Sequence, residues 1–72
     1  MQNINEIYEI VFESFDHNTD MNSNLDDLDF DSMAQIILIG ELEERHGIIL
    51  ETEELSDLHT LNDLTNLIKN KI

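Results

Sequence analysis

The segment Leu28-Asp29-Phe30-Asp31-Ser32-Met33 places a serine hydroxyl beside a carboxylate, between a polar stretch and an apolar helical pattern. Asp31 is a favourable N-cap residue, so we expect Ser32 in the first turn of a helix. A phosphate ester on Ser32 would lie against the unpaired N–H groups and the positive dipole end of that helix. An Asp-Ser pair is also a common helix cap, so the pair alone assigns no chemistry.

The acidic stretch from Asp16 to Asp27 is a second candidate, because its side-chain oxygens fall at positions 1, 3, 5, 9 and 12 of an EF-hand-like calcium loop. Two ligand-loop features are missing. Met21 stands where the sharp turn needs glycine, and Asp27 replaces the longer bidentate glutamate. The helix-start signal also comes late, at Asp31. An acidic loop that binds divalent cations weakly is the plainer interpretation, and we assign no metal ligand.

The three histidines, His17, His46 and His59, show neither metal-ligand spacing nor an HExxH motif. His46 falls on the predicted core face of a helix, which favours a packed, hydrogen-bonded histidine. No serine is surrounded by nucleophile-elbow glycines, which disfavours a Ser–His–Asp hydrolase. The chain has no cysteine, which excludes disulfides, thiolate zinc sites and a cysteine nucleophile.

Size and charge limit the function further. The 72 residues carry 17 acids against three Lys or Arg, giving a net charge of -14. We expect one domain, residues 1–72, too small for a deep catalytic pocket. The charge repels nucleic acids and anionic membranes and attracts partners with basic docking faces. The first ten residues lack signal-peptide features and no apolar run could span a bilayer, so we expect a cytoplasmic monomer without membrane insertion.

Apolar spacing predicts three main helices. The first begins near Asn3 and Glu6, which resemble a capping box, and ends near Phe15 or Asp16. Its apolar face consists of Ile4, Ile7, Tyr8, Val11 and Phe15. Residues 16–31 are predicted to form a long loop, in which Leu25, Leu28 and Phe30 pack onto the helices. A loop of this length needs a functional or packing reason.

The second helix is predicted over residues 32–46, and Gly47 is its C-terminal stop. Residues 48–50 are interpreted as a buried connection, and residues 53–57 as a short helix. Thr60 caps the last helix, with Asp63 placed to reach back, and its apolar face consists of Leu61, Leu64, Leu67, Ile68 and Ile72. The predicted core consists of Ile4, Ile7, Val11, Phe15, Leu38, Ile39, Leu42, Ile49, Leu61, Leu64 and Ile68.

The second helix has apolar residues on two nearly opposite faces. One face carries Leu38, Ile39, Leu42 and His46, and we expect it to pack into the core. The other carries Met33, Ile36, Ile37 and Gly40. That second face is either another core contact or an exposed recognition patch.

These features together resemble the acyl carrier and peptidyl carrier protein family over nearly the whole chain. Leu28-Asp29-Phe30-Asp31-Ser32-Met33 is similar to the family's L-G-x-D-S-L signature. Leu42-Glu43-Glu44-Arg45-His46-Gly47-Ile48 is similar to its L-E-E-x-F-g-i segment. Glu53-Glu54, followed by Thr60-Leu61-Asn62-Asp63-Leu64, resembles the short third helix and the T-v-x-d-l start of the last one. The resemblance implies an all-α, four-helix acyl-carrier-like bundle, with three main helices, one short helix and a long first loop.

The resemblance also implies a site. Ser32 would be the attachment point of 4′-phosphopantetheine, transferred from coenzyme A by a separate phosphopantetheinyl transferase, and Asp31 would help to position Ser32 and the transferase's metal. The arm's thiol would hold acyl or aminoacyl groups as thioesters. The carrier would not be an enzyme. Partner enzymes that load and transfer the cargo would dock on the exposed face of the second helix, formed by Met33, Ile36, Ile37, Gly40, Glu41, Glu43 and Glu44.

Several residues depart from the family pattern. Met33 stands where leucine is usual, Asp29 where glycine is common, and Glu51 where proline is frequent. Ile37 replaces an acidic residue typical of fatty-acid carriers, and His46 replaces the usual core phenylalanine. These departures favour a dedicated carrier for a polyketide, peptide, amino-acid or modified-sugar pathway over a housekeeping fatty-acid carrier. A calcium-binding helix-loop-helix module and an unmodified acidic adaptor remain the alternatives.

Overall fold

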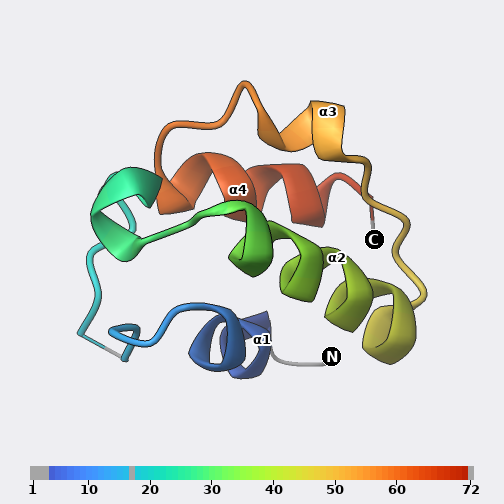
Figure 1. The fold of residues 1–72 in the computed structure, drawn as a ribbon, viewed down its shortest axis with the longest axis horizontal. Helices are drawn as coiled ribbons and strands as arrows, with labels where there is room; N and C mark the ends of the chain where they lie inside the picture. Colours follow the sequence, from blue (N-terminus) through green and yellow to red (C-terminus); the bar gives the residue numbers. More distant parts are fainter. Residues whose placement is uncertain (1–3, 17, 72) are drawn as a thin grey trace.

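Within residues 4–16 and 18–71, which the computed structural model describes, four α-helices enclose one apolar core (Figure 1). They are α1 (Ile4–Val11), α2 (Ser32–His46), α3 (Thr52–Leu55) and α4 (Leu61–Lys69), with a 3-10 helix, η1 (Leu25–Leu28), between α1 and α2. This architecture confirms the predicted all-α bundle of three main helices and one short helix. No helix in the described part of the chain has the length and apolar character needed to cross a membrane.

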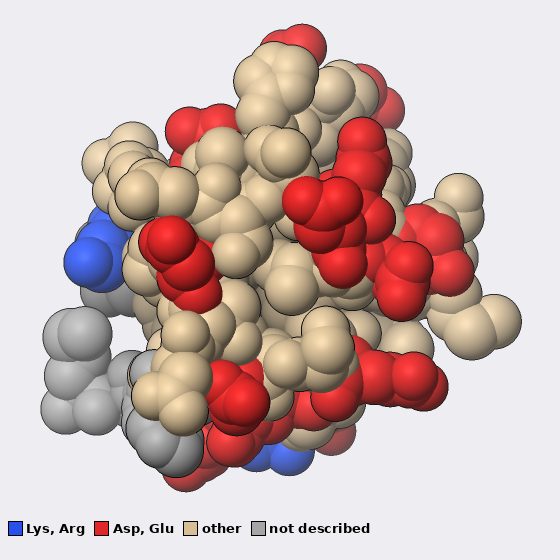
Figure 2. Space-filling model, turned by 90° about the vertical axis from the view of Figure 1, so that its left-hand side faces the viewer, with Lys and Arg blue, Asp and Glu red and all other residues tan. Residues whose placement is uncertain are grey.

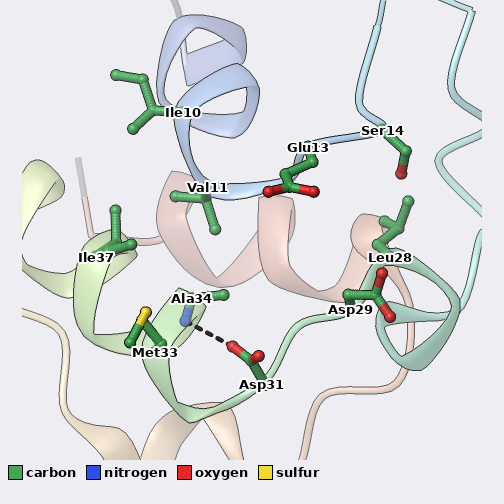
Figure 3. A pocket seen from close by; sticks show the side chains of 10 residues that line it. All are labelled: Ile10, Val11, Glu13, Ser14, Leu28, Asp29, Asp31, Met33, Ala34 and Ile37. Atoms are coloured by element: carbon green, nitrogen blue, oxygen red, sulfur yellow. Dashed lines mark hydrogen bonds between the residues drawn. The ribbon is translucent and has the colours of Figure 1, made fainter.

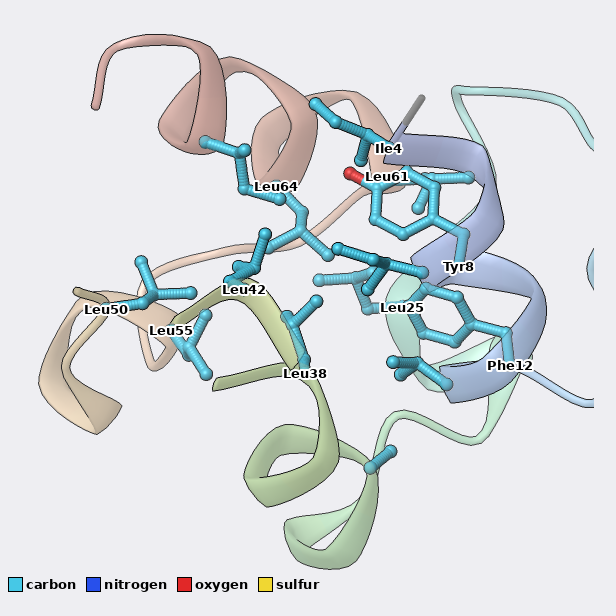
Figure 4. Packing of buried hydrophobic residues seen from close by; sticks show 14 of the residues in the cluster. Ile4, Tyr8, Phe12, Leu25, Leu38, Leu42, Leu50, Leu55, Leu61 and Leu64 are labelled. Carbon is cyan, nitrogen blue, oxygen red and sulfur yellow. The ribbon is translucent and has the colours of Figure 1, made fainter. Parts of the chain in front are cut away.

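The core is built by all the helices and by the segments between them (Figure 4). Eight predicted core residues are buried: Ile4, Ile7, Val11, Leu38, Leu42, Leu61, Leu64 and Ile68. Phe15 and Ile39 are partly buried and pack against this core. The prediction for Ile49 is wrong, because its side chain is 57% exposed. The connection between α2 and α3 buries Ile48 and Leu50 instead, so successive side chains alternate as in an extended chain.

The end of α1 differs from the prediction. The helix ends at Val11 rather than near Phe15, and Phe12 is buried although its position was not assigned to the core. The Phe12 ring centroid lies 5.6 Å from that of Tyr8 and 5.4 Å from that of Phe30, at angles typical of aromatic pairs. An aromatic cluster therefore closes this end of the bundle. The predicted cap residue Asn3 lies outside the described residues.

The long segment before α2 is held by backbone hydrogen bonds to the start of α4. The N–H of Leu25 donates to the carbonyl of His59 at 2.9 Å, and the N–H of Leu61 donates to the carbonyl of Ser23 at 3.0 Å. Leu25 and Leu28 are buried and Phe30 packs against the core, which confirms these three predicted anchors. The loop contains η1, which the sequence pattern did not indicate. Its length therefore has a packing reason.

The helix caps follow the predicted chemistry. The Thr60 side chain accepts from the N–H of Asp63 at 3.2 Å, and the Asp63 carboxylate accepts from the N–H of Thr60 at 3.1 Å. These bonds, with a further one from the N–H of His59, hold the pKa of Asp63 below its ordinary value. The short helix α3 begins one residue before the predicted range and ends at Leu55. Ile72, assigned to the last apolar face, lies outside the described residues.

One buried hydrogen bond joins α1 to α4. The Tyr8 hydroxyl lies 2.8 Å from Thr65 Oγ1, and Thr65 Oγ1 donates to the Leu61 carbonyl at 2.9 Å. A threonine hydroxyl has one proton, and a carbonyl can only accept. The Tyr8 hydroxyl is therefore the donor to Thr65. Burial raises the pKa of Tyr8 to about 12.

Candidate functional site

Ser32 is the first residue of α2, and its position is fixed by the residue before it. Asp31 is the N-cap, with extended backbone (φ -85°, ψ -174°), and its Oδ1 accepts from the N–H of Ala34 at 2.9 Å. This confirms the predicted cap. Ser32 is exposed, and its hydroxyl makes no hydrogen bond to another residue of the described chain. The loop that is hydrogen-bonded to the start of α4 therefore leads directly to an exposed serine hydroxyl at the N-terminus of α2.

The backbone conformation of Asp29 explains why an aspartate can replace glycine at this position. It adopts the left-handed conformation (φ 58°, ψ 41°) where the chain leaves η1, and its N–H bonds to the carbonyls of Leu25 and Asp26. Glycine takes this conformation without a Cβ penalty, while Asp and Asn are the side chains that tolerate it best. The backbone geometry therefore fits either the glycine common in the family or the aspartate found here.

Of the predicted core face of α2, Leu38 and Leu42 are buried and Ile39 and His46 are half-buried, while the second face, whose environment the spacing left open, is exposed. Ala34, Leu38 and Leu42 are buried against the bundle. On the opposite face Met33 is 71% exposed and Ile36 is 68% exposed. Ile37 and Gly40 are also exposed, and a Cβ built at Gly40 would meet no atom within 4 Å beyond its chain neighbours and the backbone of its own helix. Packing within this chain thus gives no reason for the glycine at position 40.

The acidic residues of α2 lie in different surroundings. Glu43 and Glu44 are exposed. Glu41 is half-buried and accepts from Arg45 at 3.3 Å, one turn along the helix. Figure 2 shows the side of the molecule that is on the left in Figure 1, where carboxylates are widespread and Lys or Arg atoms are visible only toward its left and lower edges. A cationic partner would therefore meet this side with little repulsion.

An open groove of about 520 Å³ lies between the end of α1 and the start of α2, next to Ser32 in the chain (Figure 3). One wall is formed by Ile10, Met33 and Ile37, and carboxylates line the other side. The contribution of α1 to this site was not predicted from the sequence. Ile10 is 46% exposed on the polar side of the first helix, and that apolar residue outside the core face was the available signal.

The residues considered for metal binding do not assemble. Within residues 4–16 and 18–71, no three side chains among His, Cys, Asp and Glu lie where they could hold one ion. Asp16 and Asp20 instead accept from the N–H groups of Asn18 and Asn22, two residues on, as in Asx turns. His46 is half-buried at the end of α2 and its side chain makes no hydrogen bond to another described residue, so the prediction of a hydrogen-bonded core histidine is wrong. His17 lies outside the described residues.

The chain was compared with protein-family models, curated proteins and solved structures. The comparisons with curated proteins and with solved structures gave no match. The family model described as the phosphopantetheine attachment site matches residues 5–68, which include all of α2, α3 and the segment between α1 and α2. Together with the four-helix bundle, this match shows that the chain belongs to the family of phosphopantetheine-binding carrier domains.

Proposed function

We propose that Ser32 carries the 4′-phosphopantetheine arm and that residues 1–72 form one carrier domain. The observation that carries this proposal is the exposed, unpaired hydroxyl of Ser32 at the N-terminus of α2, inside the range that the family model matches. Carrier domains of this family hold the arm covalently and receive it from a phosphopantetheinyl transferase.

The residues around Ser32 fit a phosphodiester. The first N–H groups of a helix have no intrahelical acceptor, and the Asp31 side chain takes only that of Ala34. The N–H groups of Ser32 and Met33 thus remain as donors for an anion, at the positive end of the α2 dipole. The bound arm supplies the terminal thiol, and thus the thioester chemistry, that this cysteine-free chain lacks. Asp31 holds the first turn of α2 and positions Ser32 for the transferase and its metal.

The exposed face of α2 is the proposed docking surface, formed by Met33, Ile36, Ile37 and Gly40 with Glu41, Glu43 and Glu44. Glu41 pairs with Arg45, whereas Glu43 and Glu44 make no ion pair with a described residue. Apolar anchors beside such carboxylates suit brief encounters with enzymes that present basic faces. The proposed partners are the transferase and the enzymes that load and transfer an acyl or aminoacyl cargo. The carrier contributes no catalytic group of its own. A cytoplasmic monomer that binds no nucleic acid fits the net charge of -14.

A dedicated biosynthetic pathway is favoured over housekeeping fatty-acid synthesis. Ile37 replaces the acidic residue typical of fatty-acid carriers, and its side chain is 38% exposed on the docking face. An apolar residue at that position changes which partner surfaces are complementary.

The attachment residue can be tested by intact mass. The protein is incubated with coenzyme A and a broad-specificity phosphopantetheinyl transferase, beside Ser32→Ala and the matched control Ser14→Ala, another exposed serine. We expect a gain of one phosphopantetheine mass in the wild type and in Ser14→Ala, and none in Ser32→Ala. No gain in folded wild-type protein with several transferases would refute the carrier function and favour the unmodified adaptor.

The docking face can be tested with two exposed isoleucines. Ile36→Glu removes an apolar anchor from α2. Ile49→Glu makes the same change at another exposed isoleucine, in the α2–α3 connection, outside the proposed docking surface. Burying an isoleucine contributes about 1.5–3 kcal/mol, so we expect kcat/KM for the transferase to fall by about tenfold or more in Ile36→Glu. The Ile49→Glu variant is expected to retain the wild-type rate. Equal values of kcat/KM for the two variants would show that the transferase does not dock on this face of α2.

A further inference from the structure

The groove beside Ser32 has two chemically different sides (Figure 3). Ile10 from α1 and Met33 and Ile37 from α2 form the apolar side. Glu13, Asp29 and Asp31 form the acidic side. A volume of about 520 Å³ lies within the range of small-molecule sites, roughly 300–1,000 Å³.

The acidic side has no counter-charge. No Lys, Arg or His lines the groove, and the Glu13, Asp29 and Asp31 carboxylates make no ion pair with any residue of the described chain. The three carboxylates are also not arranged to share one metal ion. The chemistry that matches both sides is therefore an organic cation with a short apolar body.

Covalent attachment makes this groove accessible to a tethered group. Asp31 and Met33, the neighbours of Ser32 in the chain, both line the groove, one on each side. A group held on an arm at Ser32 is thus confined to the surroundings of the groove, and its effective concentration there is high. Weak complementarity then suffices to fill the groove.

We propose that the groove between α1 and α2 holds the cargo and that this cargo is an aminoacyl group with a protonated amine. The inference rests on the proposed attachment at Ser32 and narrows the cargo class. The ammonium group lies toward Glu13 and Asp29, and the aliphatic side chain lies against Ile10, Met33 and Ile37.

The test compares two cargoes of the same shape. Coenzyme A analogues that carry alanyl or isobutyryl groups through a stable amide are transferred to the ¹⁵N-labelled protein, and loading is confirmed by mass. The two groups differ only in that the alanyl group has an ammonium group where the isobutyryl group has a methyl group. Amide chemical shifts of Ile10, Ala34 and Ile37 report on the groove. The variant Glu13→Gln/Asp29→Asn removes two charges, and asparagine tolerates the left-handed backbone at position 29. Glu9→Gln/Asp27→Asn is the control, because neither residue lines the groove.

We expect the alanyl group to occupy the groove about 1.4- to fivefold more than the isobutyryl group, the factor that an exposed ion pair gives, and the amide shifts to increase in proportion. The excess should disappear in Glu13→Gln/Asp29→Asn and in about 1 M NaCl, but persist in the control. Equal shifts for the two cargoes, or shifts only outside the groove, would overturn the inference while leaving the carrier function intact. A protein that cannot be loaded at all would overturn the carrier function and this inference with it.

Discussion

The hydrogen bond between Tyr8 and Thr65 predicts an asymmetry between two conservative substitutions. Because Thr65 Oγ1 donates to Leu61 and accepts from Tyr8, the two partners have different roles. Tyr8→Phe removes a donor and leaves Thr65 bonded to Leu61. Thr65→Val removes the acceptor and leaves the Tyr8 hydroxyl, in a residue that is 1% exposed, without a partner.

The free energies follow from that difference. Losing a satisfied hydrogen bond costs about 0.5–1.5 kcal/mol, whereas leaving a buried donor unpaired costs about 1–3 kcal/mol. Thr65→Val is therefore expected to be the more destabilising variant. In the double variant Tyr8→Phe/Thr65→Val no buried hydroxyl remains at this contact, so it should be more stable than Thr65→Val alone.

Urea unfolding of the four proteins, at equal slopes, gives the required free energies of unfolding. Tyr8→Phe more destabilising than Thr65→Val, or strictly additive effects in the double variant, would refute the assigned direction of the bond. The pH dependence is a second check. The folded pKa of Tyr8, about 12, exceeds the ordinary value of 10.0, so its contribution is complete below pH 10 and is lost as pH rises toward 12. That loss, about 3 kcal/mol, should be absent in Tyr8→Phe.

Three further outcomes are expected. Gly40→Ala should raise the melting temperature by about 4–8 °C, because alanine is about 1 kcal/mol more favourable within a helix and the site is open; calorimetry showing no increase would contradict this. Hydrogen bonds to Asp63 lower its pKa, and the bond from Lys71 at 2.9 Å lowers the pKa of Glu54. Each carboxylate therefore contributes fully to the free energy of unfolding above its ordinary pKa, and this contribution is lost as pH falls through the pKa of the folded state. The free energy of unfolding should therefore decrease less steeply with falling pH in Asp63→Asn than in the wild type. Equal slopes would show that Asp63 does not contribute to the acid sensitivity. Salt should raise the melting midpoint, since it screens the net charge of -14, and an unchanged midpoint in a NaCl series would show that repulsion is unimportant.

The helix α2 was predicted most accurately from the sequence, because its signals are local. Asp31 caps its start, and Gly47, at φ 66°, ends it in the left-handed conformation that glycine adopts readily. Its two apolar faces were recognised from spacing alone. Such features depend on residues within a few positions of one another, so one sequence contains them.

The errors have different causes. Phe12 lies four residues after Tyr8 and eight after Ile4, so helical spacing already places it beside the buried face, and its omission from the predicted core was a misreading of that pattern. Ile49 is exposed because the connection is extended, so its neighbours take the core positions. The groove was missed because its acidic and apolar sides come from α1, α2 and the loop between them, and helical spacing does not show which segments meet.

The backbone bonds between residues 21–25 and 59–62 have a consequence for enzymes that act at the proposed attachment site. A loop that becomes ordered only on contact with a partner subtracts its conformational entropy from the affinity. Here the segment leading to Ser32 is already fixed, at one end by α4 and at the other by the turn in which the N–H of Asp31 bonds to the Asp29 carbonyl at 2.8 Å. The serine is thus presented in a preorganised position. An enzyme that binds there loses no affinity to the ordering of this loop, even when the contact area between the enzyme and the carrier is small.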